Sequence, residues 1–299
     1  MPTAQTVSPS TADFSGLWIP LITPFTADTR AVDHVALKRL LAHYRQTGIA
    51  GYVVCGSTGE AAALSKQEQW EVLETVLEHA DGLPAILGYS GYNLQDALAF
   101  VRKAADHPLH GLLVAAPHYI RPSQDGLLHW FETIASAASQ PVLIYDIPYR
   151  TGVEMSVQTL QHLALHPNIQ GIKDCGGSAA KTQQLIADGQ LQVLAGEDHQ
   201  IFSTVAAGGR GAIAASSHVR TEDFAAVIRL ISSGDLAEAR AHWKPLVPLV
   251  SALFAEPNPA CIKSALAQMG LIDNSLREPM MPARQAFAMD LLEKQFATA

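Results

Sequence analysis

Short apolar runs alternate with longer segments of helical periodicity from Gly16 onward. The runs are rich in Val, Ile and Leu, which is typical of strands that are buried on both faces. The segments between them repeat apolar residues at i, i+3, i+4 and i+7, as helices packed on a core do. The runs that we expect to form strands are Leu17–Thr23, Gly51–Cys55, Pro84–Gly88, Gly111–Ala115, Pro141–Tyr145, Ile169–Lys173, Gln192–Ala195 and Gly211–Ala214.

Eight strand–helix units predict a closed (β/α)8 barrel, that is, a TIM barrel, over residues 14–235. An open doubly wound sheet is the alternative, but the G-x-G-x-x-G turn that such sheets use to bind dinucleotides does not follow the first run. Residues 236–299 contain no further strand pattern and are predicted to form a C-terminal helical extension, interrupted at Glu256-Pro257-Asn258-Pro259. Residues 1–13 are small and polar, do not resemble a signal peptide, and are predicted to be a disordered tail.

Composition narrows the class of function. The 299 residues carry a net charge of −8 without a basic run, so a nucleic-acid partner is not expected. No apolar run has the length of a membrane span. The cysteines Cys55, Cys175 and Cys261 lie far apart and the twelve histidines are scattered, so we expect neither disulfides nor a metal site. These features predict a cytoplasmic protein without a cofactor.

Lys173 is the most informative residue, because an active site in such a barrel lies where the strands end. It closes the sixth apolar run, just before the turn Asp174-Cys175-Gly176-Gly177. A buried ammonium loses hydration, which disfavours its charged form, and a neutral amine can form a Schiff base with a carbonyl substrate. For an isolated lysine the more common alternative is a side chain that ends a strand and points into water.

The segment after the second run places hydroxyl groups at the same end of the barrel. In Gly56-Ser57-Thr58-Gly59-Glu60, glycines flank two hydroxyls that can converge with backbone N–H groups on a small anion such as a carboxylate. The alternative is a helix cap, but the Ser65-x-x-Glu68 motif fits the next helix better.

The fourth and fifth runs are followed by a second set of candidates. Tyr119 follows the fourth run and Tyr145 ends the fifth, and a phenol with a hydroxyl partner can shuttle protons. Arg150 lies in a loop bounded by proline and glycine, where its guanidinium could bind a carboxylate or form an ordinary surface salt bridge. By contrast, Gly208-Gly209-Arg210-Gly211 precedes a strand, so we interpret its glycines as a helix end and a turn, not as a phosphate site.

Taken together, these segments resemble the dihydrodipicolinate synthase / N-acetylneuraminate lyase family of class I, pyruvate-dependent aldolases. The resemblance extends from about residue 16 to about residue 270, with the motifs in the family's order. The motifs that carry it are Gly56–Glu60, Tyr119 with Arg121-Pro122-Ser123-Gln124, Tyr145 with Pro148 and Arg150-Thr151-Gly152, Gly171-Ile172-Lys173-Asp174 and Glu256-Pro257-Asn258-Pro259.

The resemblance implies how pyruvate would be held. Lys173 would form the Schiff base with the keto carbon, and the carboxylate would bind the hydroxyls and backbone of Ser57 and Thr58, next to Gly56. The backbone carbonyl of Ile213 would line the same site.

The resemblance also implies how the second substrate would be handled. Tyr145 would relay protons, and Ser57 would link it to Tyr119, which in the family reaches in from a neighbouring subunit. Arg150 would hold the carboxylate of aspartate semialdehyde. A shared tyrosine requires at least a homodimer, and the family suggests a homotetramer.

This chain departs from the usual pattern of the synthases, which have threonine in place of Ser57 and asparagine in place of Asp146. His118-Tyr119-Ile120 replaces Tyr-Tyr-Asn, and Gly176-Gly177-Ser178 replaces Thr-Gly-Asn. The pyruvate half remains intact, whereas Asp146 is expected to place a negative charge close to a site for acidic substrates.

Three functions therefore compete. The first is condensation of pyruvate with L-aspartate semialdehyde to give 4-hydroxy-tetrahydrodipicolinate, a step of lysine biosynthesis. The second is a paralogous aldolase or dehydratase that acts on a 2-keto-3-deoxy sugar acid or a related keto acid. The third is a catalytically silent binder of a pyruvate-like molecule.

The resemblance also bears on regulation, because many bacterial synthases of this family bind lysine at the interface of two subunits. The matching residues are Ala61, Ala62, Lys66, Gln69, Tyr92, Asp96 and His118. Lys66 would place a cation where a cationic ligand should bind, so we expect no strong inhibition by lysine.

Overall fold

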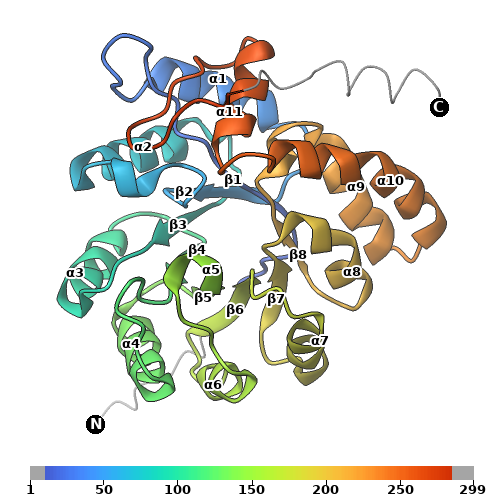
Figure 1. Cartoon of the computed structure of the whole chain (residues 1–299). Coiled ribbons are helices and arrows are strands. Elements are labelled where there is room, and N and C mark those ends of the chain that lie inside the picture. Colours follow the sequence, from blue (N-terminus) through green and yellow to red (C-terminus); the bar gives the residue numbers. More distant parts are fainter. Residues whose placement is uncertain (1–10, 285–299) are drawn as a thin grey trace.

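The structure, a computed structural model, describes residues 11–284. It contains a closed barrel of eight parallel strands in sequence order, surrounded by helices (Figure 1). The strands are β1 (Gly16–Pro20), β2 (Gly51–Val54), β3 (Ala85–Tyr89), β4 (Gly111–Ala115), β5 (Val142–Asp146), β6 (Ile169–Asp174), β7 (Gln192–Ala195) and β8 (Gly211–Ile213). The predicted (β/α)8 barrel is confirmed, and all eight predicted strands are present.

The first strand is shorter than predicted, because β1 ends at Pro20 and not at Thr23. Leu21 still donates its N–H to Val53 O of β2 at 2.9 Å, but the two residues after it bind loops at the barrel mouth. Ile22 donates its backbone N–H to the His218 ring, and Thr23 Oγ1 donates to the carbonyl oxygen of Gly59 at 2.7 Å.

Most of the helices cover the outside of the barrel. The helices are α1 (His34–Tyr44), α2 (Lys66–His79), α3 (Leu94–Ala104), α4 (Gln124–Ala137), α5 (Pro148–Thr151), α6 (Val157–Leu163), α7 (Ala179–Asp188), α8 (Ile201–Ala206), α9 (Thr221–Ser232), α10 (Leu236–Leu253) and α11 (Ala260–Gln268). The predicted capping box begins α2: Glu68 N donates to Ser65 Oγ, and Ser65 N donates to Glu68 Oε2. At the other end of the barrel, Gly208 has a left-handed φ of 107° after α8, as expected for a helix end that turns into β8.

Alternation along the strands decides which side chains face the barrel interior. Successive residues of a strand point to opposite faces, so every second residue belongs to the inner layer, and the others pack between strands and helices. Because the two layers are separate, a residue at the mouth can be assigned to one or the other from its place in the strand. The inner layer includes Phe14, Trp18, Val53, Ile86, Leu113, Leu143, Tyr145, Leu194 and Ile213.

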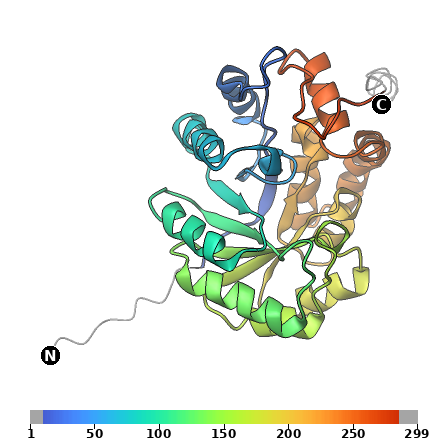
Figure 2. The same cartoon turned by 60° about the vertical axis from the view of Figure 1, so that its left-hand side comes forward.

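The C-terminal helices α10 and α11 pack on the barrel, and the predicted break at 256–259 separates them. Figures 1 and 2 both place the last described segment, in red, beside α1, in blue. Arg39 of α1 donates to the carbonyl oxygens of Gly270 and Leu271, which joins the two regions. Within residues 11–284, no helix combines the length and the apolar character needed to cross a bilayer.

The predicted division into tail, barrel and extension stays a prediction. Residues 1–10 of the predicted tail and 285–299 of the predicted extension lie outside the described residues. At the floor of the barrel, Ala12 N donates to Gln170 Oε1 at 2.9 Å, and Gln192 Nε2 donates to Ala12 O at 2.6 Å. The last residues before the barrel therefore bind its lower end.

Candidate active site

Lys173 and Tyr145 lie side by side at the mouth of the barrel. They are partners in the register of β5 and β6, and both side chains point into the interior. The Lys173 amine lies 4.5 Å from the centroid of the Tyr145 ring, and the lysine is only 6% exposed. The sequence-based expectation of a buried lysine at a strand end therefore holds, and the side chain does not point into water.

Ser57 connects the second strand to this pair, since its Oγ lies 3.4 Å from the Tyr145 hydroxyl. Burial raises the pKa of Tyr145 above its ordinary value, and the hydrogen bond with Ser57 opposes this rise. The phenol consequently holds its proton and can donate it to a group that develops negative charge beside Lys173.

The loop 56–60 forms a tight turn at the end of β2. Gly59 N donates to Gly56 O at 3.1 Å, and Glu60 N donates to Ser57 O at 3.2 Å. Thr58 is buried, and its hydroxyl accepts a hydrogen bond from Asn258 Nδ2 at 3.0 Å. Because Ser65 caps α2, the alternative in which Ser57 caps that helix does not apply.

Arg150 belongs to the one-turn helix α5 and lines a cavity of about 610 Å³ at the mouth. Its guanidinium lies 5.7 Å from the ring centroid of Tyr149. Glu197 and Asn258 line the same cavity, so a guanidinium, a carboxylate and an amide share one space.

Ile213 and Tyr119 are the remaining predicted site residues. Ile213 ends β8, and its side chain is part of the inner layer, close under the mouth. Tyr119 is 84% exposed, so within a single chain its phenol does not pack in the cavity. Its backbone has a left-handed φ of 73°, and its N–H donates to Thr151 O at 3.3 Å.

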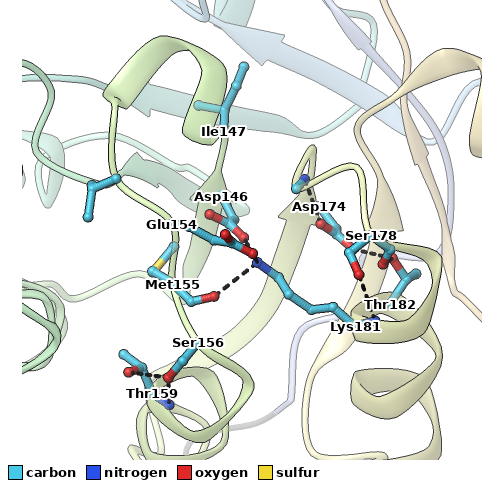
Figure 3. A network of polar contacts seen from close by, with 12 residues as sticks. Asp146, Ile147, Glu154, Met155, Ser156, Thr159, Asp174, Ser178, Lys181 and Thr182 are labelled. Atoms are coloured by element: carbon cyan, nitrogen blue, oxygen red, sulfur yellow. Dashed lines mark hydrogen bonds and ion pairs between the residues drawn. The ribbon is translucent and has the colours of Figure 1, made fainter.

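The expectation that Asp146 adds a charge close to the substrate site is wrong. Asp146 follows Tyr145 in the strand, so its side chain points to the opposite face, away from the barrel interior (Figure 3). Its fully buried carboxylate lies 2.5 Å from the Lys181 ammonium of α7, which also donates to Met155 O at 3.0 Å. Burial raises the pKa of Asp146, and the charge of Lys181 opposes this rise.

Asp174 occupies the matching position on β6, beside Asp146 in the register. Its carboxylate accepts hydrogen bonds from Thr182 Oγ1 at 2.5 Å and from Gly176 N at 2.9 Å (Figure 3). A Cβ atom on Gly176 would lie 3.0 Å from Lys181 Nζ, so this glycine leaves room for the ion pair. Two consecutive residues of α7 thus bind the ends of both strands that carry the candidate pair.

The sequence pattern gave little reason to single out Glu197 or Lys181. Glu197 follows β7 at the mouth, where burial raises the pKa of its carboxyl group, Asp198 adds to the rise and Lys173 opposes it. Its position just after a strand end is a signal that could have identified it. Lys181 could have been noticed only as a lysine in the first turn of α7, the helix that follows Lys173.

Comparisons with known proteins agree with this geometry. The pattern of the dihydrodipicolinate synthetase family matches residues 13–294. The 4-hydroxy-tetrahydrodipicolinate synthase of Methanosarcina mazei is 37% identical over 276 residues, which cover 91% of this chain and 94% of that protein.

Solved structures show the same similarity. Dihydrodipicolinate synthase from Aquifex aeolicus superposes with a TM-score of 0.90 at 31% identity, covering 95% of this chain and 98% of that chain. Dihydrodipicolinate synthase from Acinetobacter baumannii, solved in complex with pyruvate, superposes with a TM-score of 0.89 at 30% identity. The match covers 93% of this chain and 97% of that chain. The resemblance seen in the sequence motifs is therefore confirmed, and this chain belongs to the dihydrodipicolinate synthetase family.

Proposed function

We propose that this chain condenses pyruvate with L-aspartate semialdehyde to give 4-hydroxy-tetrahydrodipicolinate. One observation carries the proposal: a buried amine, a buried phenol and a serine hydroxyl form a contiguous group at the barrel mouth, namely Lys173, Tyr145 and Ser57. The curated relatives named 4-hydroxy-tetrahydrodipicolinate synthase support the choice of reaction.

In the proposed mechanism, the Lys173 amine attacks the keto carbon of pyruvate, and water leaves as the imine forms. Loss of a proton from the methyl carbon to solvent water converts the imine to an enamine, which attacks the aldehyde carbon of the acceptor. The aldehyde oxygen then needs a proton. Tyr145 retains its proton at neutral pH because burial raises its pKa, and it lies against Lys173, so it is suited to deliver that proton.

Two of the charged residues that line the mouth cavity support the choice of acceptor. Aspartate semialdehyde carries both a carboxylate and an ammonium group. Arg150 and Glu197 line one cavity, so a guanidinium is available for the first group and a carboxylate for the second. The tail of a sugar-derived aldehyde is neutral and would need neither of them.

Assembly and location are also part of the proposal. We infer at least a dimer, with a homotetramer as the family's usual form, in which Tyr119 of one subunit completes the site of its neighbour. Exposed apolar side chains at Tyr92, Tyr119 and Ile120 support a contact surface on this side. The three cysteines are free and buried, which suits the reducing cytoplasm.

A substrate panel tests the acceptor. The purified enzyme is supplied with pyruvate and either L-aspartate semialdehyde or neutral polyhydroxy aldehydes, and kcat/KM is compared. We expect a clear preference for the semialdehyde, and Arg150→Leu should raise KM for it without preventing imine formation with pyruvate. A higher kcat/KM with a polyhydroxy aldehyde would favour the sugar-acid aldolase instead.

A further inference from the structure

The C-terminal extension reaches the loop 56–60 from outside the barrel. Asn258, between α10 and α11, donates to Thr58 Oγ1 at 3.0 Å. Lys263 of α11 places its ammonium 2.5 Å from Glu60 Oε1, and the backbone N–H of Arg277 donates to Glu60 Oε2 at 3.1 Å. Residues distant in sequence therefore bind the middle and the C-terminal end of this short loop.

We propose that Lys263 is a positioning residue for pyruvate binding, which acts through Glu60 to hold the loop 56–60 in its binding conformation. The inference rests on the proposed function, because it takes Ser57 and Thr58 as the groups that bind the pyruvate carboxylate.

The backbone of Glu60 needs to be held in place. Its φ is 52°, in the left-handed region that residues with a Cβ atom rarely adopt. Gly59 before it is packed against the segment that follows β1, since a Cβ atom there would lie 2.8 Å from the Leu21 carbonyl oxygen. The loop is thus fixed by the chain after β1 on one side and by α11 on the other.

A shift at Glu60 would reach the candidate catalytic pair through two contacts. Glu60 N donates to Ser57 O at 3.2 Å, and Ser57 Oγ lies 3.4 Å from the Tyr145 hydroxyl. The side-chain anchor of Glu60 is therefore coupled to the hydroxyl that is proposed to bind pyruvate.

The environment of Lys263 is costly for a charged group. Lys263 is fully buried, its ammonium lies 4.1 Å from the centroid of the Phe25 ring, and it donates to Ser275 O at 2.9 Å. Burial lowers the pKa of Lys263 to about 8, although Glu60 opposes the change. An apolar pair of similar volume is often at least as stable as a buried ion pair, so stability alone does not explain these two charges. The pair is explained instead by the conformation that it imposes on the loop 56–60.

The test uses three variants and one control in the full-length protein. Lys263→Met and Glu60→Gln each break the pair, and the double variant Glu60→Gln/Lys263→Met removes both charges, so that no buried charge is left unpaired. Leu40→Ala, in the buried face of α1, controls for a general loss of stability. The pyruvate concentration for half-maximal borohydride trapping is measured for each protein, together with kcat.

We expect the double variant to fold and to need about tenfold more pyruvate, in line with the loss of one charge-assisted contact. Trapping at saturating pyruvate should still reach one adduct per chain, and Leu40→Ala should keep the parent's half-saturation. A double variant with the parent's half-saturation would overturn the inference, even if Lys263→Met does not fold. If the parent protein itself traps no pyruvate, that result contradicts the proposed function and not only the role of Lys263.

Discussion

Asp146 and Lys181 form a buried ion pair directly behind the strand ends that carry Tyr145 and Lys173. The carboxylate and the ammonium are 2.5 Å apart, and both side chains are almost completely buried. The neighbouring Asp174 binds Thr182, so α7 contacts β5 through one residue and β6 through the next. The ion pair thus helps to fix the register that places the lysine against the phenol.

Breaking this pair should destabilise the protein. Lys181→Met leaves the Asp146 carboxylate buried without its counter-ion, and we expect the free energy of unfolding to fall by about 3–5 kcal/mol. Asp146→Asn/Lys181→Met removes both charges and should recover most of that loss. Urea unfolding of the two variants and the parent measures the effect. Equal stability of Lys181→Met and the parent would show that the pair contributes nothing.

Removing the phenol of Tyr145 should impair turnover more than binding. Tyr145→Phe keeps the ring against Lys173 but removes the group that transfers protons, so we expect kcat to fall by roughly 10²–10⁴-fold. The fold should tolerate the change, and pyruvate should still bind. Steady-state kinetics and melting temperature test this together. Turnover close to that of the parent would rule out the proton relay through Tyr145.

His218 should make the protein less stable in mild acid. Its ring is fully buried, accepts the Ile22 N–H and contacts the Ala215 carbonyl oxygen, and burial lowers its pKa from 6.5 to about 4. Between these values the unfolded chain binds the proton and the folded chain does not, so stability is complete above pH 6.5 and is lost as the pH falls towards 4.

Protonation of His218 should lower the free energy of unfolding by on the order of 3 kcal/mol in total. Unfolding free energies of the parent and of His218→Gln, measured between pH 7 and pH 4.5, isolate it. The parent should lose more stability over this range than the variant does. Parallel pH curves would mean that His218 is protonated in the folded protein as readily as in the unfolded one.

Free lysine should not inhibit the enzyme strongly. The residues that match the family's lysine site lie around a hollow of about 1080 Å³, which contains Lys66, Tyr92, Asp96 and His118. The Lys66 ammonium lies 3.9 Å from the Asp96 carboxylate, so the acid that would bind a ligand's amine already faces a cation. Titration of lysine into the active enzyme tests this. Saturable inhibition below about 1 mM, some −4 kcal/mol of binding, would contradict it.

The strands could be predicted from the sequence because each is a short apolar run that ends at polar or glycine-rich residues. Lys173, Tyr145 and Ser57 could be singled out because strand ends meet at one face of a barrel. Long-range pairing could not be predicted, since nothing in the local sequence shows that Lys181 faces Asp146 or that Lys263 faces Glu60.

The outward position of Asp146 follows from the sequence pattern, against our expectation from its charge. The alternation that points Tyr145 into the barrel sends the next residue to the outside, whatever its charge. The place of Tyr119 depends on a second copy of the chain, and a single sequence does not show where that copy binds.

Trapping of the pyruvate adduct tests the proposed chemistry most directly. The enzyme is incubated with pyruvate and borohydride, digested, and analysed by mass spectrometry, with Lys173→Ala as the control. One reduced pyruvate should be found per chain, on the peptide that contains Lys173, and the variant should show neither adduct nor turnover. An adduct on another lysine, or no adduct on a protein that remains active, would contradict the Schiff-base mechanism.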